Sequence, residues 1–213
     1  MNEALRAVVD GIGLLRHHYE RRRALADNAV SRELGAVLAL IERVDFTNPD
    51  ESEFRPSGHA VTKLLGDLRS RTGAVADVLG AFHPLFPALP WRYSYEPRGD
   101  GLENSMAWAE FVGPIAPFGS GKVCLGITAI GPNTRYPEHR HPAVETYFVL
   151  SGRARWTAAG VSQEHAPGAF ILHPSNVVHA METGEEPLIA AYTWTGDIET
   201  LSCWDESIRA AEI

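Results

Sequence analysis

Hydrophobic residues near the start of the chain recur at intervals of three and four, the spacing of one face of an α-helix. In residues 3–25 the recurring positions are Leu5, Val8, Val9, Ile12, Leu15 and Tyr19. Residues 31–44 show the same spacing, with Ser31 as a predicted N-cap and Glu33 in the first turn, where the helix dipole favours a negative charge. The pattern therefore predicts two helices in this part of the chain.

A polar stretch with two prolines, residues 46–58, interrupts the helical pattern. Residues 59–82 show helical spacing again and predict one or two further helices, with an interruption near Gly73. Residues 82–91 contain three prolines, and because proline lacks the N–H that a helix needs, this stretch predicts irregular chain.

From Trp91 onward the chain changes to short runs of β-branched and aromatic residues separated by turn signals, a pattern typical of an antiparallel sandwich or barrel. The predicted strands are residues 91–97, 106–113, 122–131, 144–152, 154–160, 169–174 and 188–196. Residues 203–213 predict a short C-terminal helix. We therefore expect a mainly β protein with two parts, a helical region of residues 1–90 that packs on a β-barrel of residues 91–213.

Composition narrows the class of protein. The 213 residues are 45% hydrophobic, enough for one sizeable core, and the net charge of −8 argues against a nucleic-acid partner, which would need a basic patch. No run of about 20 apolar residues predicts a membrane span, and the N-terminus has no secretory pattern. Two cysteines give no disulfide framework. We expect a soluble, cytoplasmic protein without a membrane partner.

The candidate chemistry lies in the stretch YPEHRHPAVETY, residues 136–147. His139, His141, Glu145 and Tyr147 all have odd numbers, so an extended chain directs them to one side, although the proline at 142 perturbs the alternation locally. Nitrogen and oxygen ligands of this kind suit divalent first-row metals. A candidate fourth ligand, His179, follows a Pro-Ser-Asn turn further along the chain.

These residues resemble the two motifs of the cupin superfamily. His139, His141, Glu145 and a glycine at 152 resemble the first motif, and a glycine at 168, a proline at 174 and His179 resemble the second. Asparagines at 133 and 176 stand where the family often has glycine, a mild departure because Asn tolerates the left-handed conformation. The resemblance covers about residues 105–197 and implies a single cupin antiparallel β-barrel, a double-stranded β-helix or jelly roll, with one metal ion inside.

A narrower resemblance rests on the two tyrosines that flank the ligands, Tyr136 and Tyr147, together with the N-terminal helical extension and a WTGD segment near the C-terminus. In this respect the chain looks like the cupin dimethylsulfoniopropionate (DMSP) lyases. The resemblance implies a metal-dependent β-elimination, in which a proton leaves the carbon next to the carboxylate and the products are dimethyl sulfide and acrylate. The implied metal is a divalent ion, with Zn, Fe, Mn, Co and Ni all open.

The implied roles follow from the difficulty of the reaction. A metal that binds the substrate carboxylate would stabilise the negative charge of the transition state. A phenol is a poor base at neutral pH unless a nearby cation stabilises its phenolate. We expect Tyr147 to be the base and Tyr136 to be a second base candidate or a substrate-positioning hydroxyl. Tyrosine is also common in ordinary strands and cores, so the alternative for each of the two residues is a structural role.

The small sulfonium carboxylate substrate also needs a site for its positive end. An aromatic face contributes about 0.5–2 kcal/mol to binding a cation, and the candidates are Trp108, Trp156 and Trp194, each of which would otherwise be a core residue. His165 and His173 are predicted to be bystanders, because turn and pre-proline positions rarely direct a side chain inward.

The even-numbered positions of the same strand, Val144, Thr146, Phe148 and Leu150, are too apolar for a solvated surface. Either the N-terminal helices or a second subunit must cover them, so a homodimer is a reasonable expectation. The alternatives for function are another cupin metalloenzyme, such as a sugar isomerase or a dioxygenase, and a non-enzymatic ligand-binding cupin, because the same ligands serve all of them.

Overall fold

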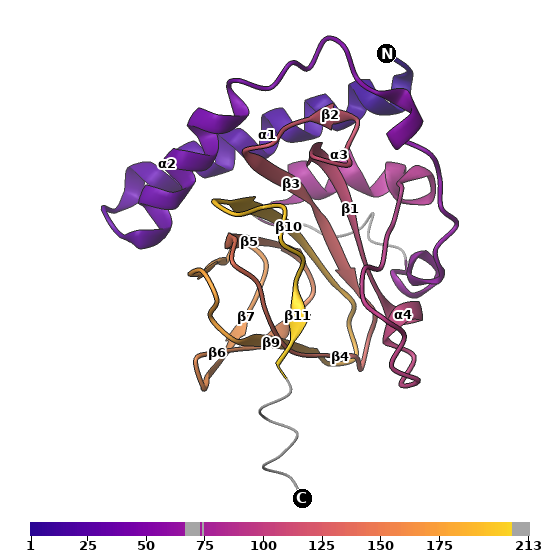
Figure 1. Cartoon of the computed structure of the whole chain (residues 1–213), viewed down its shortest axis with the longest axis vertical. Coiled ribbons are helices and arrows are strands. Elements are labelled where there is room, and N and C mark those ends of the chain that lie inside the picture. The colour runs from indigo at the N-terminus through magenta and orange to yellow at the C-terminus, as the bar shows by residue number, and fades with distance from the viewer. Residues whose placement is uncertain (67–72, 74, 206–213) are drawn as a thin grey trace, which may run out of the picture.

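The computed structural model describes residues 1–66, 73 and 75–205 (Figure 1). The α-helices are α1 (Glu3–Leu25), α2 (Ala29–Ile41), α3 (Ala76–Phe82) and α4 (Leu102–Ser105). Three 3-10 helices are η1 (Glu51–Glu53), η2 (Ala60–Leu64) and η3 (His83–Ala88). The prediction of a helical N-terminal region is therefore confirmed, but η3 forms where the prolines predicted irregular chain, since one proline lies in its first turn, where a missing N–H has no cost.

The strands form two sheets. They are β1 (Met106–Gly113), β2 (Phe118–Gly119), β3 (Val123–Ile130), β4 (Arg135–Arg140), β5 (Val144–Ser151), β6 (Ala154–Ala158), β7 (Val161–His165), β8 (Phe170–His173), β9 (His179–Thr183), β10 (Leu188–Thr195) and β11 (Cys203–Trp204). One sheet has the order β2-β1-β3-β10-β5-β8 and the other has the order β11-β4-β9-β6-β7. All neighbours pair antiparallel except β1 with β2, so the predicted cupin barrel is confirmed.

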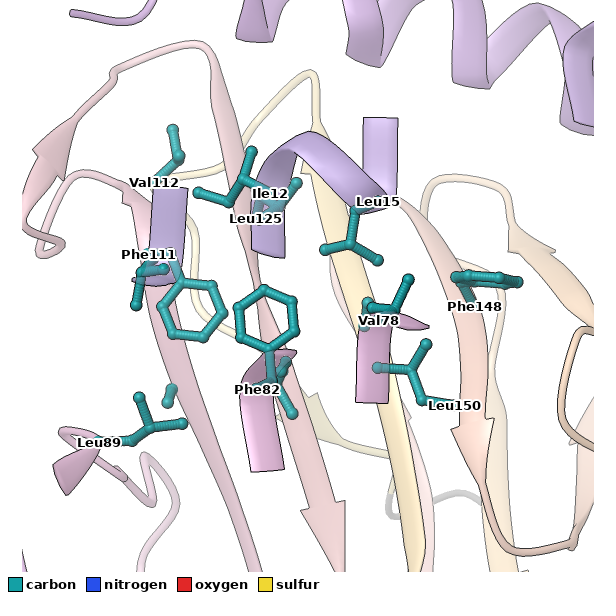
Figure 2. Packing of buried hydrophobic residues seen from close by; sticks show 14 of the residues in the cluster. Ile12, Leu15, Val78, Phe82, Leu89, Phe111, Val112, Leu125, Phe148 and Leu150 are labelled. Carbon is teal, nitrogen blue, oxygen red and sulfur yellow. The ribbon is translucent and has the colours of Figure 1, made fainter. Parts of the chain in front are cut away.

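The helices α1, α2 and α3 lie over the outer face of the six-stranded sheet (Figure 1). Figure 2 shows Val78 of α3 beside Phe148 and Leu150 of the sheet, and Phe82 of the same helix beside Phe111. The rings of Phe82 and Phe111 stack with centroids 5.1 Å apart. The apolar face of β5 is thus covered by helices of the same chain, one of the two covers that the sequence left open. The homodimer, and the division into residues 1–90 and 91–213, stay predictions.

Helix starts show how local sequence sets the boundaries. The side chain of Asn28 accepts a hydrogen bond from the Ser31 N–H at 3.0 Å and caps α2. The predicted N-cap, Ser31, is therefore wrong, because Asn28 offers a capping oxygen three residues earlier and leaves Ser31 buried inside the helix. Glu33 consequently falls beyond the first turn, where it accepts a hydrogen bond from the Thr195 hydroxyl.

One strand prediction and one helix prediction need correction. Residues 91–97 form no strand beyond an isolated bridge of Arg92 with Trp108, and the C-terminal helix is wrong at its start, where Cys203–Trp204 pair with β4. Residues 206–213 lie outside the described residues.

The asparagines at 133 and 176 adopt the left-handed conformation, with φ of 49° and 60°, as their place in the turns requires. None of the described helices has the length and apolar character needed to cross a membrane.

Candidate metal and substrate site

Three potential metal ligands meet inside the barrel. One ligand atom each from His141, Glu145 and His179 lie within 4.8 Å of one another, and all three side chains are buried. Glu145 comes from β5, His179 begins β9 in the opposite sheet, and His141 lies in the short connection between β4 and β5. The two sheets therefore bring the two sequence motifs together, as the resemblance implied.

Backbone carbonyls fix the orientation of each imidazole. The Nδ1 atom of His141 lies 3.0 Å from the Ala143 carbonyl oxygen, and that of His179 lies 2.8 Å from the Val177 carbonyl oxygen. A ring that donates its Nδ1–H in this way presents the lone pair of Nε2, the arrangement found in metal-binding histidines. The Nε2 atoms of His141 and His179 lie 3.1 and 3.3 Å from the same carboxylate oxygen of Glu145.

The charges and lone pairs of this cluster favour the binding of a positive ion. Burial raises the pKa of Glu145, but His141 and His179 outweigh it and hold the pKa well below its usual range. Burial lowers the pKa of His141, yet the Glu145 carboxylate outweighs it and raises the pKa. The Nε2 atom of His179 is buried and has no hydrogen bond of acceptable geometry among the described residues. Two imidazole nitrogens and a carboxylate that converge on one point form a donor set of the kind that binds divalent cations.

His139 lies beside this cluster but outside it. Its Nδ1 is 2.7 Å from the Pro137 carbonyl oxygen, and its ring centroid is 4.0 Å from that of His179 and 6.4 Å from that of His141. Its ring stacks on Tyr136, with centroids 3.9 Å apart and planes inclined by 17°. The structure thus gathers three of the four predicted ligands and holds the remaining one, His139, against a tyrosine.

Both predicted tyrosines line the cavity that contains the ligands. Tyr147 reaches it from β5 by ordinary alternation with Glu145. Tyr136 has even parity and reaches it because the pairing of β4 with β9 shifts between Tyr136 and His139, which places an extra residue on β4 and reverses the alternation. Burial raises the pKa of both phenols well above 10 when no cation is near.

The three predicted tryptophans differ in position. Trp108 and Trp194 line the cavity, and the indole Nε1–H of Trp194 donates a 2.7 Å hydrogen bond to Glu145. Trp156 is buried behind Tyr147, with ring centroids 5.5 Å apart, and is not among the residues that line the cavity. The lining of the cavity therefore gives no support to the prediction that Trp156 contacts substrate.

Sequence reasoning also missed residues of the site. His173 is completely buried and its ring stacks on His179 with centroids 4.1 Å apart, so the expectation that a pre-proline residue points away is wrong. The Tyr95 hydroxyl lies 2.6 Å from that of Tyr136. Glu110 and Tyr192 also line the cavity. Their parity with Trp108 and Trp194 on the same strands was the signal that could have found them.

Comparison with known proteins now defines the class. The family model for DMSP lyases matches residues 36–190, and the chain belongs to this family. A curated protein of Cereibacter sphaeroides named as a DMSP lyase, DddL, is 34% identical over 160 residues, 73% of this chain and 67% of its own length. The DMSP lyase DddQ of Ruegeria pomeroyi is 32% identical over 132 residues, which cover 61% of this chain and 66% of that protein.

Solved structures show the same relationship. The crystal structure of DddQ from Ruegeria pomeroyi superposes with a TM-score of 0.77 at 25% identity, over 97% of this chain and 98% of that one. A structure described with the DMSP lyases RdDddP and RnDddQII has a TM-score of 0.78 at 23% identity, over 95% of this chain and 100% of that one. The helical extension and the barrel are thus shared together.

Proposed function

We propose that this protein is a metal-dependent lyase that cleaves DMSP by β-elimination to dimethyl sulfide and acrylate. The observation that carries the proposal is a buried cluster of metal-type ligands that shares one cavity with two tyrosines, in a chain of the DMSP lyase family. The cavity has a volume of about 310 Å³, enough for a small carboxylate substrate.

His141, Glu145 and His179 are the proposed ligands of one divalent ion, with Zn, Fe, Mn, Co and Ni as candidates. The chemistry that such an ion supplies is Lewis acidity, which draws charge from the substrate carboxylate. His139 lies outside the cluster, so we assign it the positioning of Tyr136, on which it stacks.

Tyr147 is the proposed base. It removes the proton from the carbon next to the carboxylate, the electron pair forms the carbon–carbon double bond, and dimethyl sulfide leaves with the electrons of the carbon–sulfur bond. Burial and the adjacent Glu145 raise the pKa of the Tyr147 phenol, so its phenolate forms only when a positive charge compensates them. Tyr136, whose hydroxyl contacts that of Tyr95, is the second base candidate or positions the substrate.

The experiment is to incubate metal-loaded protein with DMSP and to measure dimethyl sulfide by gas chromatography and acrylate by liquid chromatography. We expect equal amounts of the two products. A protein loaded in turn with each of the five metals that releases neither product would overturn the proposed function.

A further inference from the structure

A second buried carboxylate, Glu110 of β1, lines the same cavity as the metal-type ligands. Its side chain is 7% exposed, and its Oε1 atom has no hydrogen-bond partner among the described residues. The Tyr192 hydroxyl donates to Oε2 over 3.4 Å, a long hydrogen bond. A buried carboxylate with one unpaired oxygen is costly in an apolar barrel and calls for a role beyond packing.

Two glycines make room for this arrangement. Gly113, with φ of +154°, lies so close to Glu110 that a Cβ there would overlap the carboxylate. Gly126 is the cross-strand neighbour of both Glu110 and Tyr192, and a Cβ there would lie 2.6 Å from the Tyr192 ring. The pairing of β1 with β3 also shifts directly after Glu110, a bulge of the kind that re-aims a side chain. The backbone is thus shaped around the carboxylate and the phenol.

The position of Glu110 places its charge away from the metal-type cluster. Successive register partners across β1, β3, β10 and β5 are Glu110, Gly126, Tyr192 and Tyr147. Three strand intervals of about 4.8 Å give a path of roughly 14 Å along the sheet, so the straight distance between the first and last Cα atoms is shorter because the sheet curves. Side chains from both ends reach inward, so a short zwitterion fits with one charge at each end and its acidic carbon near Tyr147.

The charges of the cavity agree with this orientation. No lysine or arginine belongs to the described residues that line it, and the nearby Arg92 guanidinium, which pairs with Glu53, has only a small effect on Glu110. A sulfonium group is a cation without N–H or O–H donors, so it cannot replace a hydrogen bond but can balance a carboxylate at contact distance and rest on aromatic faces. Tyr192, which contacts Glu110, and Trp108 and Trp194 supply such faces in the same cavity.

We propose that Glu110 is the counter-charge that selects the cationic head of the substrate. Tyr192 holds the carboxylate of Glu110 in place. The inference rests on the proposed lyase function, since it assigns the second end of the same substrate. It makes Glu110 a specificity-determining residue rather than a part of the proton chemistry.

The test compares two ligands of the same shape, 3-(trimethylammonio)propanoate and 4,4-dimethylpentanoate, which differ in the charge of the head. Isothermal titration calorimetry on metal-loaded protein measures both dissociation constants. We expect the wild type to bind the cation at least about tenfold more tightly, Glu110→Gln to lose this preference, and Glu110→Asp to keep most of it. Glu20→Gln, the same change at an exposed position of α1 that does not line the cavity, should keep it as well.

Unchanged affinity of Glu110→Gln for the neutral ligand shows that the variant is folded. Equal binding of the two ligands by the wild type overturns the inference without any variant, and so does a retained preference in Glu110→Gln. Dimethyl sulfide release without a cation preference leaves the lyase function and removes the role of Glu110. A cation preference without dimethyl sulfide release leaves the role of Glu110 and removes the lyase function.

Discussion

The two faces of the six-stranded sheet are built from alternate residues of the same strands, yet they bury different chemistry. On the outer face, β5 directs Phe148 and Leu150 at the N-terminal helices, in a cluster of apolar side chains. On the inner face, the same strand directs Glu145 and Tyr147 into the cavity. Burial of the apolar outer face stabilises the fold. This stabilisation offsets the free-energy cost of burying titratable groups on the inner face. Substitutions on the two faces should therefore affect different measurements.

The largest effect is expected at the inner face, from His179→Ala. Loss of one of three clustered ligands should reduce bound metal to a small fraction of the wild-type stoichiometry and reduce dimethyl sulfide release to background. Metal analysis by inductively coupled plasma mass spectrometry checks this. His165→Ala, at the end of β7, is the control that should keep the metal.

His139→Ala separates the two histidines of the first motif. We expect it to retain most of the metal and to lower turnover, because His139 stacks on Tyr136 and lies outside the ligand cluster. A loss of metal equal to that of His179→Ala would restore His139 to the ligands.

Removal of the proposed base comes next. Tyr147→Phe should lower kcat by about a hundred- to ten-thousand-fold while bound metal stays near the wild-type level. Tyr19→Phe removes a buried hydroxyl on the outer face and should leave kcat unchanged. Activity of Tyr147→Phe within a few-fold of wild type, together with a large loss in Tyr136→Phe, would transfer the role of base to Tyr136.

The outer face should respond in stability alone. Phe82→Ala deletes a fully buried ring that stacks on Phe111, and the free energy of unfolding should fall by about 3–5 kcal/mol. Urea titration followed by circular dichroism measures this change. The kcat per folded molecule should not change, and a lower kcat in fully folded protein would show that the two faces are coupled.

A smaller effect is expected from Trp194→Phe, which removes the indole hydrogen bond to Glu145 and leaves the ring in place. Loss of a partner that orients a ligand typically weakens metal binding by about 10- to 100-fold, measurable by competition with a chelator. The matched control is Trp156→Phe, whose Nε1 has no hydrogen-bond partner among the described residues. Equal losses in both variants would mean that packing, and not the hydrogen bond, matters.

The smallest effect is a dependence on pH. Burial raises the pKa of Glu110, and the nearby Cys124 thiol, Ile115 N–H, Tyr192 hydroxyl and Arg92 guanidinium only partly offset it. Below this raised pKa the carboxyl group is neutral, so the preference for the cationic over the neutral ligand should be greatest at high pH and fall as the pH is lowered. The ratio of the two dissociation constants cancels titrations that affect both ligands. A ratio that does not change with pH would contradict the role of Glu110.

The sequence predicted features that depend on regular spacing and missed those that depend on irregular backbone. The helix over residues 3–25 and the strand over residues 106–113 follow from periodicity and are confirmed. The burial of His173 was not predicted, because it follows from the pairing of β8 with β5 and not from the proline that comes next in the sequence. This pairing directs the His173 side chain inward. The presence of Tyr136 in the cavity depends on a pairing shift in β4, which only the partner strand determines.

The hydrogen bonds from three imidazoles to the main chain have a broader consequence. His139, His141 and His179 each engage a carbonyl two residues away, so the chain segment that carries each ring also orients it. The orientation of each ring nitrogen therefore depends on residues within two positions of the histidine, and not on side chains from distant parts of the barrel. A site organised in this way can be inherited intact while the rest of the cavity wall diverges toward new substrates.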